Sequence, residues 1–297
     1  MSNAMEWLQF VLAPQMINGL SIGVAVVLMA LGLTIIFGLL DVINMAHGEF
    51  YAIGAYLAVA LLATGMSFWW ALVRTPLLMA VLGFVTERGL IQRVFHSKDR
   101  HTLTLLLTFG VAVVLEDALK IAFGANPLRL EAPISGATEM LGLFFPNYRL
   151  FVMLFGGALI AAVWLLVFRT SLGAIVRAAA YDRNMSASLG VPVQLVYAGT
   201  FAFGVALAGI AGVLLAPIYS VFPTMGKDFV LIAFSVVIIG GMGSIKGALL
   251  AGLLLTQVQS ISSLYISPVW SDPLLFGIMV LVLMWRPQGL FGKLGSA

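Results

Sequence analysis

The sequence predicts an all-α fold, a polytopic bundle of helices embedded in a membrane, and two observations lead to this prediction. First, the 297-residue chain is 62% hydrophobic and 9% charged, whereas soluble proteins are about 25% charged. So few charges cannot cover a water-exposed surface. Second, apolar stretches recur along the whole chain, many of them near the roughly 20 residues that a helix needs to cross a bilayer. Cysteine is absent, which excludes disulfides and thiolate chemistry.

Nine apolar stretches are candidates for membrane spans. Two of them, 50–65 and 229–240, are short, so we expect about eight to ten spans. The other candidates are 12–38, 69–91, 103–123, 150–168, 196–219, 248–264 and 274–285.

The basic residues lie mainly on one side of the predicted membrane. If the spans alternate, ten of the fifteen Lys and Arg residues fall in loops on a single side, which the positive-inside rule assigns to the cytoplasm together with the C-terminus. Nine crossings then put the N-terminus outside, unless a re-entrant crossing near 39–48 adds one more. The ten residues are Arg88, Arg93, Lys98, Arg100, Arg169, Arg177, Arg183, Lys246, Arg286 and Lys293.

The chain is expected to form one membrane domain, 5–297. Residues 1–4 are interpreted as an expression-vector scar before Met5 and are left out of the fold. Small residues four apart predict close helix packing. These pairs are Gly19 with Gly23, Gly157 with Ala161, and Gly204 with Ala208.

A polar segment interrupts the apolar sequence between the first two spans. It contains Asp41, Asn44, His47 and Glu49. Polar groups at membrane depth are costly unless they face protein or water, so a broken or re-entrant segment near 39–48 at a transport pathway or gate is one interpretation. The other is a tight loop in which Asn44 and Glu49 cap helices. His47 and Glu49 have no further His or Cys nearby, which argues against a metal site.

A second polar segment, 171–193, is too polar to span the membrane. It is rich in Ala, and Gly190 followed by Pro192 is typical of a helix end. The expected short amphipathic helix has Met185, Ala187 and Leu189 on its apolar side. That side docks either on a cytosolic partner or on the membrane interface, and the residues leave both interpretations open.

Charged residues near the outer end of the fourth span form a third cluster. Glu116 and Asp117 are spaced to pair with Lys120, which indicates mutual neutralisation or, alternatively, a proton relay. The glycine-rich segment 239–248 has the wrong order of residues for a phosphate-binding loop and predicts a tight turn. No catalytic motif is present, so we do not expect an enzyme.

Four stretches carry a resemblance to a known family. They are Gly32-Leu-Thr34-Ile-Ile-Phe-Gly38 running into Ile43-Asn44-Met-Ala46-His47-Gly48-Glu49-Phe50, the run Arg177 to Gly190, the turn Gly240-Gly241-Met-Gly243-Ser244, and Arg286-Pro287-Gln288-Gly289-Leu290-Phe291. Together they resemble the permease family of ABC importers for branched-chain amino acids, of the LivH type. The resemblance covers 10–292.

The resemblance implies a permease domain over 5–297 that translocates branched-chain amino acids or similar small solutes, with urea, amides and aromatic acids as other possible substrates. It implies no ATPase and no cofactor in this chain, since ATP-Mg binds to two cytosolic ATPase subunits. Further implied partners are a second homologous permease and an extracytoplasmic binding protein, all at the bacterial cytoplasmic (inner) membrane.

The resemblance also assigns roles to residues. A cytoplasmic loop, 170–195, contains the coupling helix that docks on the ATPase. Thr34, Asp41, Asn44, His47 and Glu49 belong to the translocation pathway or its gate. The coupling residues are Ala180, Tyr181, Asp182, Arg183, Met185, Ala187, Leu189 and Gly190.

One alternative class stays open at this stage. An autonomous ion-coupled secondary transporter or channel needs no ATPase partner, and Asp41, Glu49 and the 116–120 cluster are the residues that favour it.

Overall fold

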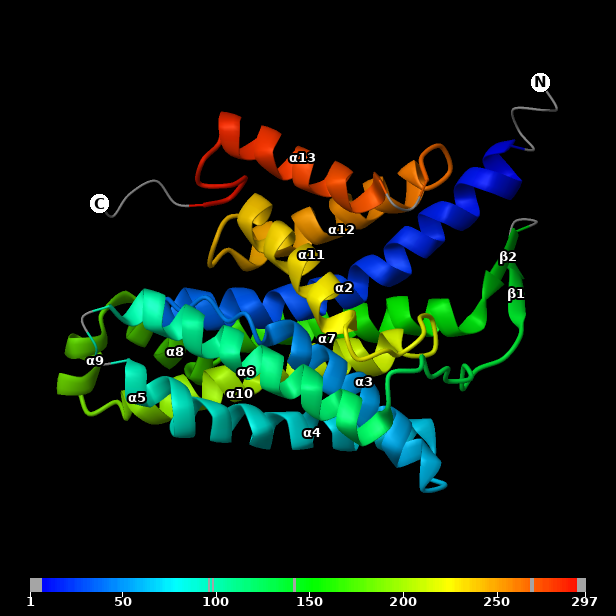
Figure 1. The fold of residues 1–297 in the computed structure, drawn as a ribbon. Coiled ribbons are helices and arrows are strands. Elements are labelled where there is room, and N and C mark those ends of the chain that lie inside the picture. The colour runs from blue at the N-terminus through cyan, green and yellow to red at the C-terminus, as the bar shows by residue number, and fades with distance from the viewer. Residues whose placement is uncertain (1–6, 96, 98, 141–142, 268–269, 293–297) are drawn as a thin grey trace.

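The computed structural model describes residues 7–95, 97, 99–140, 143–267 and 270–292. The expected scar at 1–4 lies outside the described residues, as do Lys98 and Lys293. Most of the described chain is helical, and long helices run roughly side by side (Figure 1).

Six helices in the described part of the chain are long and apolar enough to cross a membrane. Three shorter helices complete the bundle, and the nine together coincide with the nine predicted stretches. The six long helices are α2 (Ala13–Leu40), α4 (Phe68–Thr86, continued by a π-helical turn and α5, Gln92–Val94), α6 (Arg100–Phe123), α7 (Asn147–Arg169), α10 (Val193–Leu215) and α12 (Ile245–Ser262). The shorter three are α3 (His47–Ala63), α11 (Met225–Gly240) and α13 (Ser271–Trp285).

The two ends of the bundle differ in chemistry. At one end, here called the basic end, lie α5, α8 (Ser171–Tyr181) and α9 (Arg183–Ser188), together with the predicted basic loops (Figure 1). At the other end, the hairpin end, β1 (Ala137–Met140) pairs antiparallel with β2 (Leu143–Pro146), with Ala137 opposite Pro146. This hairpin departs from the all-α prediction. It lies within 124–146, outside the apolar stretches, where water can pair with the free backbone groups of a short strand.

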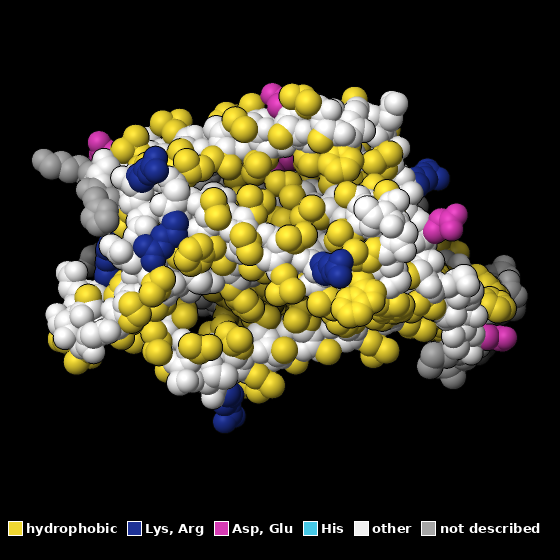
Figure 2. Space-filling model, turned by 90° about the horizontal axis from the view of Figure 1, so that it is seen from below, with side chains coloured by type: hydrophobic (Ala, Val, Ile, Leu, Met, Phe, Trp, Pro, Cys, Tyr) yellow, Lys and Arg dark blue, Asp and Glu magenta, His cyan; other side chains and the backbone are white. Residues whose placement is uncertain are grey.

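Helix α2 is the central element of the fold. Its 28 residues extend about 42 Å at 1.5 Å per residue, from the hairpin end to the basic end (Figure 1). It packs against α7, α10, α11 and α12, and its residues from Val24 to Ile36 are almost all buried. The outer helices instead expose apolar side chains, and hydrophobic groups cover most of the face seen in Figure 2. That surface suits contact with lipid.

Glycines allow the inner helices to cross at backbone contact. A Cβ atom on Gly48 of α3 would lie 2.0 Å from the carbonyl oxygen of Gly226 in α11, and one on Gly32 of α2 would lie 2.4 Å from that of Gly204 in α10. Of the predicted pairs, Gly204 packs as expected. Gly157 does not, because nothing lies within 4 Å of its Cβ position; the adjacent Gly156 makes the contact, with Val24.

The close crossing of α3 and α11 predicts that adding one methyl group at Gly48 strongly destabilises the fold. Gly48→Ala should lower the free energy of unfolding by about 1–3 kcal/mol, since neither the Gly226 carbonyl nor the Val230 side chain can give way freely. Gly157→Ala is the matched control on a helix with open space around it. Thermal unfolding in detergent compares the two, and equal midpoints would contradict the crossing.

Candidate functional site

The chain leaves the helical conformation directly after α2. Among the described residues, Asp41 is the one non-glycine residue with a positive φ, at 53°. The backbone then stays non-helical through Ala46. The Asp41 carboxylate lies 3.2 Å from Arg100 Nη2 and 3.4 Å from His101 Nε2. Asp41 is therefore at the surface of the basic end, apart from the other predicted pathway residues.

From Asp41 the chain turns back into the bundle. His47 Nε2 lies 3.0 Å from the carbonyl oxygen of Met29, and because a carbonyl can only accept, Nε2 carries the proton. Met29 precedes Leu40 by eleven residues, or about 17 Å along α2. Helix α3 therefore begins at membrane depth, which confirms the predicted broken or re-entrant segment and excludes a tight surface loop.

Side chains form hydrogen bonds with the backbone groups of the unwound segment, which is required where little water is available. Thr108 of α6 accepts a hydrogen bond from the Met45 N–H (3.1 Å) and is placed to donate to the Ile43 carbonyl (3.2 Å). Asn44 Oδ1 accepts from the Ala46 N–H (3.1 Å). The N-cap residue of α3 is Ala46, without a side-chain cap, so Asn44 closes the turn before the helix and the predicted cap by Asn44 is wrong.

Several buried polar atoms near this break lack a protein partner within the described residues. Buried polar atoms are nearly always paired in stable cores, so such exceptions mark positions where water or a solute can be expected. The atoms from α2, α3 and the segment between them are Thr34 Oγ1, Asn44 Nδ2, His47 Nδ1, Glu49 Oε2, Tyr51 OH and Tyr56 OH.

A second helix, α11, also begins inside the bundle and meets α3 there. The Glu49 carboxylate lies against Gly226, within 3 Å of where a Cβ would stand. The next residue, Lys227, reaches across to α6, where its Nζ lies 2.6 Å from Glu116 Oε2. Lys120 holds the other oxygen of Glu116 at 2.7 Å. Sequence reasoning found the pairing within α6 but missed Lys227, because no local spacing relates residues 111 positions apart.

The predicted coupling segment consists of two helices rather than one. Asp182 takes an extended conformation (φ −145°) and its Oδ1 accepts from the Met185 N–H (2.9 Å), so it ends α8 and caps α9. Gly190, with φ +84°, ends α9, and the Val191 N–H donates to the Ser186 carbonyl. Ala180 and Ala187 are exposed. Three large side chains also face outward: Tyr181 (94% exposed), Met185 (60%) and Leu189 (77%).

Arg183 differs from its neighbours because it turns inward. Its guanidinium lies 4.9 Å from the ring centre of Phe95 and 5.5 Å from that of Tyr197 in α10. Arg100, the partner of Asp41, lies 5.5 Å from the same Phe95 ring. The Phe95 ring therefore contacts both arginines and, through Arg100, connects α9 to the start of the broken segment.

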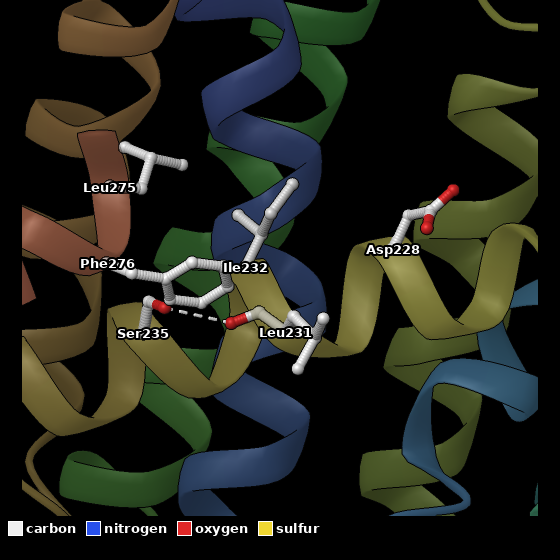
Figure 3. A pocket seen from close by; sticks show the side chains of 6 residues that line it. All are labelled: Asp228, Leu231, Ile232, Ser235, Leu275 and Phe276. Carbon is white, nitrogen blue, oxygen red and sulfur yellow. Dashed lines mark hydrogen bonds between the residues drawn. The ribbon is translucent and has the colours of Figure 1, made fainter. Parts of the chain in front are cut away.

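Two hollows elsewhere do not form polar sites. A recess of about 30 Å³ lies between α11 and α13, where the Ser235 hydroxyl turns to the Leu231 carbonyl and Asp228 points away (Figure 3). A larger groove of about 390 Å³ lies near the basic end between α2, α7, α8 and α10. Apart from Thr200, its lining is apolar, so it offers nothing to a charged solute.

The fold is that of a multi-pass membrane helix bundle. A family model described as branched-chain amino acid transport system / permease component matches residues 15–283. The chain belongs to this family, which makes it the transport component and not the ATPase.

Relatives match along nearly the full chain. The LivH permease protein of the high-affinity branched-chain amino acid transport system of Salmonella typhimurium is 31% identical, over 94% of this chain and 95% of the relative. BraD of Pseudomonas aeruginosa, with a corresponding description, is 30% identical over the same shares. LivM of Escherichia coli is 28% identical over 89% of this chain and 67% of LivM.

A solved structure shares the fold. PsaBC from Streptococcus pneumoniae in complex with Fab superposes with a TM-score of 0.51 at 14% identity, covering 96% of this chain and 95% of that one. At this identity the match supports the helix bundle and carries no statement about substrate.

Thr108 should be a structural anchor of the broken segment. Thr108→Val keeps the shape but leaves the Met45 N–H and the Ile43 carbonyl unpaired, and we expect a loss of about 1–3 kcal/mol in the free energy of unfolding. Thr102→Val, at an exposed position of the same helix, is the control. Thermal unfolding of both variants in detergent measures the difference, and a Thr108 variant as stable as the control would refute the anchoring role.

Proposed function

We propose that this chain is the permease subunit of an ABC importer that translocates branched-chain amino acids or closely similar small solutes. The observation that carries the proposal is the near full-length similarity to LivH and BraD, whose descriptions specify that transport system. Urea, short amides and aromatic acids are the other solutes we consider. The geometry supports a pathway, since α3 and α11 both begin within the membrane beside unpaired polar atoms.

The importer would contain further subunits. We propose a second, homologous permease, an extracytoplasmic binding protein, and two cytosolic ATPases that bind ATP-Mg, with the basic end in the cytoplasm of a bacterial inner membrane. Similarity to both LivH and LivM, two permease proteins with the same system description, supports the paired permeases. The positive-inside rule supports the orientation, which places the C-terminus in the cytoplasm.

The ATPase would dock on α8 and α9. Tyr181, Met185 and Leu189 form an exposed apolar surface outside the membrane spans, of the kind that marks a protein contact. Ala180, Asp182, Ala187 and Gly190 complete the docking segment, while Arg183 fastens it to the bundle.

Motion of the ATPase would reach the pathway through packed groups. A push on α9 acts on Phe95 and Tyr197 through Arg183. Tyr197 belongs to α10, which crosses α2 and α3 at backbone contact, and Phe95 contacts Arg100, the partner of Asp41. Both routes end at the broken segment, which is the candidate two-state element that coupling requires. Thr34, Asn44, His47 and Glu49 would line or support the pathway, and Asp41 would act at its cytoplasmic mouth.

The proposed docking surface predicts that a charge placed in it weakens binding of the ATPase. Met185→Asp should reduce the ATPase recovered with the affinity-purified chain by roughly tenfold or more, because a charge would be buried in an apolar contact. Phe144→Asp, an equally exposed apolar residue on the hairpin, should leave recovery unchanged. Mass spectrometry of material purified gently from native membranes measures both.

The same preparation tests the importer itself. In liposomes, leucine uptake should require the binding protein and ATP on the ATPase side. Recovery of the wild-type chain alone, together with uptake driven by an ion gradient and no ATP, would replace the proposal with a secondary transporter.

A further inference from the structure

A carboxylate shared between two helices stands out among the charged groups of the bundle. Glu116 is 4% exposed, and each of its oxygens pairs with a different lysine. Lys120 lies one turn along the same helix, so that pair moves as a unit. Lys227 belongs to α11, and its pairing with Glu116 therefore depends on how α6 and α11 are placed.

The shared carboxylate lies close to the starts of both half-helices. Glu116 precedes the end of α6 at Phe123 by seven residues, or about 10 Å. The Glu49 carboxylate, in the first turn of α3, lies within 3 Å of where a Cβ on Gly226 would stand, and Gly226 directly precedes Lys227. Glu49 is 2% exposed and its Oε2 has no hydrogen-bond partner within the described residues. An acceptor of hydrogen bonds is thus available beside the Glu116–Lys227 pair.

The lysine side of this cluster cannot face lipid. The Lys227 side chain is 60% exposed, and the neighbouring Asp117 is exposed as well. Charged side chains within membrane spans face a water-filled cavity or protein, since exposure to hydrocarbon costs several kcal/mol. The ammonium group of Lys227 also has three donors, and Glu116 Oε2 is its ion-pair partner.

We infer that the Glu116–Lys227 pair is a transient binding site for the charged end of an amino-acid zwitterion. The solute's carboxylate takes the place of Glu116 at Lys227. Its ammonium group takes Glu116 Oε2, the oxygen that Lys227 releases, with Glu49 Oε2 as a second acceptor. Lys120 keeps the other Glu116 oxygen throughout. This inference rests on the proposed function, because it assigns the substrate's charged groups to atoms of the same pathway.

The exchange is favourable in physical terms because no charge becomes unpaired. Separating an ion pair is costly mainly where it leaves an uncompensated buried charge, and in this pair the buried charge is that of Glu116. A zwitterion supplies one charge of each sign at a short spacing, so each protein group exchanges one partner for another. A solute with a single charge or none would leave either Lys227 or the Oε2 oxygen of Glu116 without an ion-pair partner. The site therefore allows zwitterions to pass faster than other solutes. Its affinity for them stays low because the solute competes with an existing ion pair.

Substitutions at the pair test the inference in the complete reconstituted importer. Lys227→Met and Glu116→Gln should each lower the maximal rate of leucine uptake by roughly 10- to 100-fold, as expected for loss of one charge-assisted hydrogen bond. Lys227→Arg keeps the charge and should stay within about threefold of wild type. Glu131→Gln neutralises an exposed carboxylate outside this cluster and is the matched control. Size-exclusion chromatography verifies that each complex is assembled.

A labelling experiment separates solute binding from a purely structural ion pair. The chain has no cysteine, and Thr224 is exposed with its carbonyl accepting from the Lys227 N–H. In Thr224→Cys, reaction with a charged thiol reagent should be severalfold slower with leucine-loaded binding protein and ATP than with empty binding protein and ATP. Equal rates, or full uptake by Lys227→Met, would overturn the site while wild-type uptake still supports the importer. A wild-type complex without ATP-driven uptake would instead overturn the proposed function.

Discussion

The architecture depends on one constraint, the backbone contact between α3 and α11 at membrane depth. A Cβ on Gly48 would lie 2.0 Å from the carbonyl oxygen of Gly226, and a Cβ on Gly226 would lie within 3 Å of the Glu49 carboxylate. The contact fixes where α3 begins, and the chain must then return from Asp41 through unwound backbone to reach it. The Met45 and Ala46 N–H groups on this path donate to Thr108 Oγ1 and Asn44 Oδ1, because backbone groups inside a membrane must be paired with protein or water.

The same contact places the charged groups. Glu49 follows Gly48 and Lys227 follows Gly226, so the crossing brings a carboxylate and an ammonium to the same depth. Glu116 of α6 completes the cluster. At the basic end, Arg183 and Arg100 share the Phe95 ring and link the docking segment to Asp41. The proposed pathway and the proposed ATPase contact are therefore joined by packed side chains and not by loops.

Much of this could be predicted from the sequence, and the exceptions have physical reasons. Span positions follow from hydropathy, whereas the four polar residues near 39–48 are consistent with either a break in the bundle or a tight loop. The packed face of α7 could not be predicted, because the small-residue pattern selects Gly157 with Ala161. The contact is made by Gly156, about 100° around the helix and followed four residues later by Ile160. Alternation of spans places Lys227 in an outer loop, and only the tertiary fold brings it to Glu116. The interruption at Asp182 could not be predicted, since a residue that caps a helix can also continue one.

The most direct test of this account is whether water reaches the broken segment. Met45 is partly exposed within it, and Phe109 of the neighbouring α6 is exposed among apolar groups. The variants Met45→Cys and Phe109→Cys are each prepared in the assembled importer, and the rate of reaction with a charged, membrane-impermeant thiol reagent is measured without nucleotide and with ATP bound. The account predicts that the thiol of Met45→Cys reacts at a rate that changes between the two states, while the thiol of Phe109→Cys stays unreactive. A Met45→Cys variant as unreactive as Phe109→Cys in both states would contradict a water-filled pathway at this break.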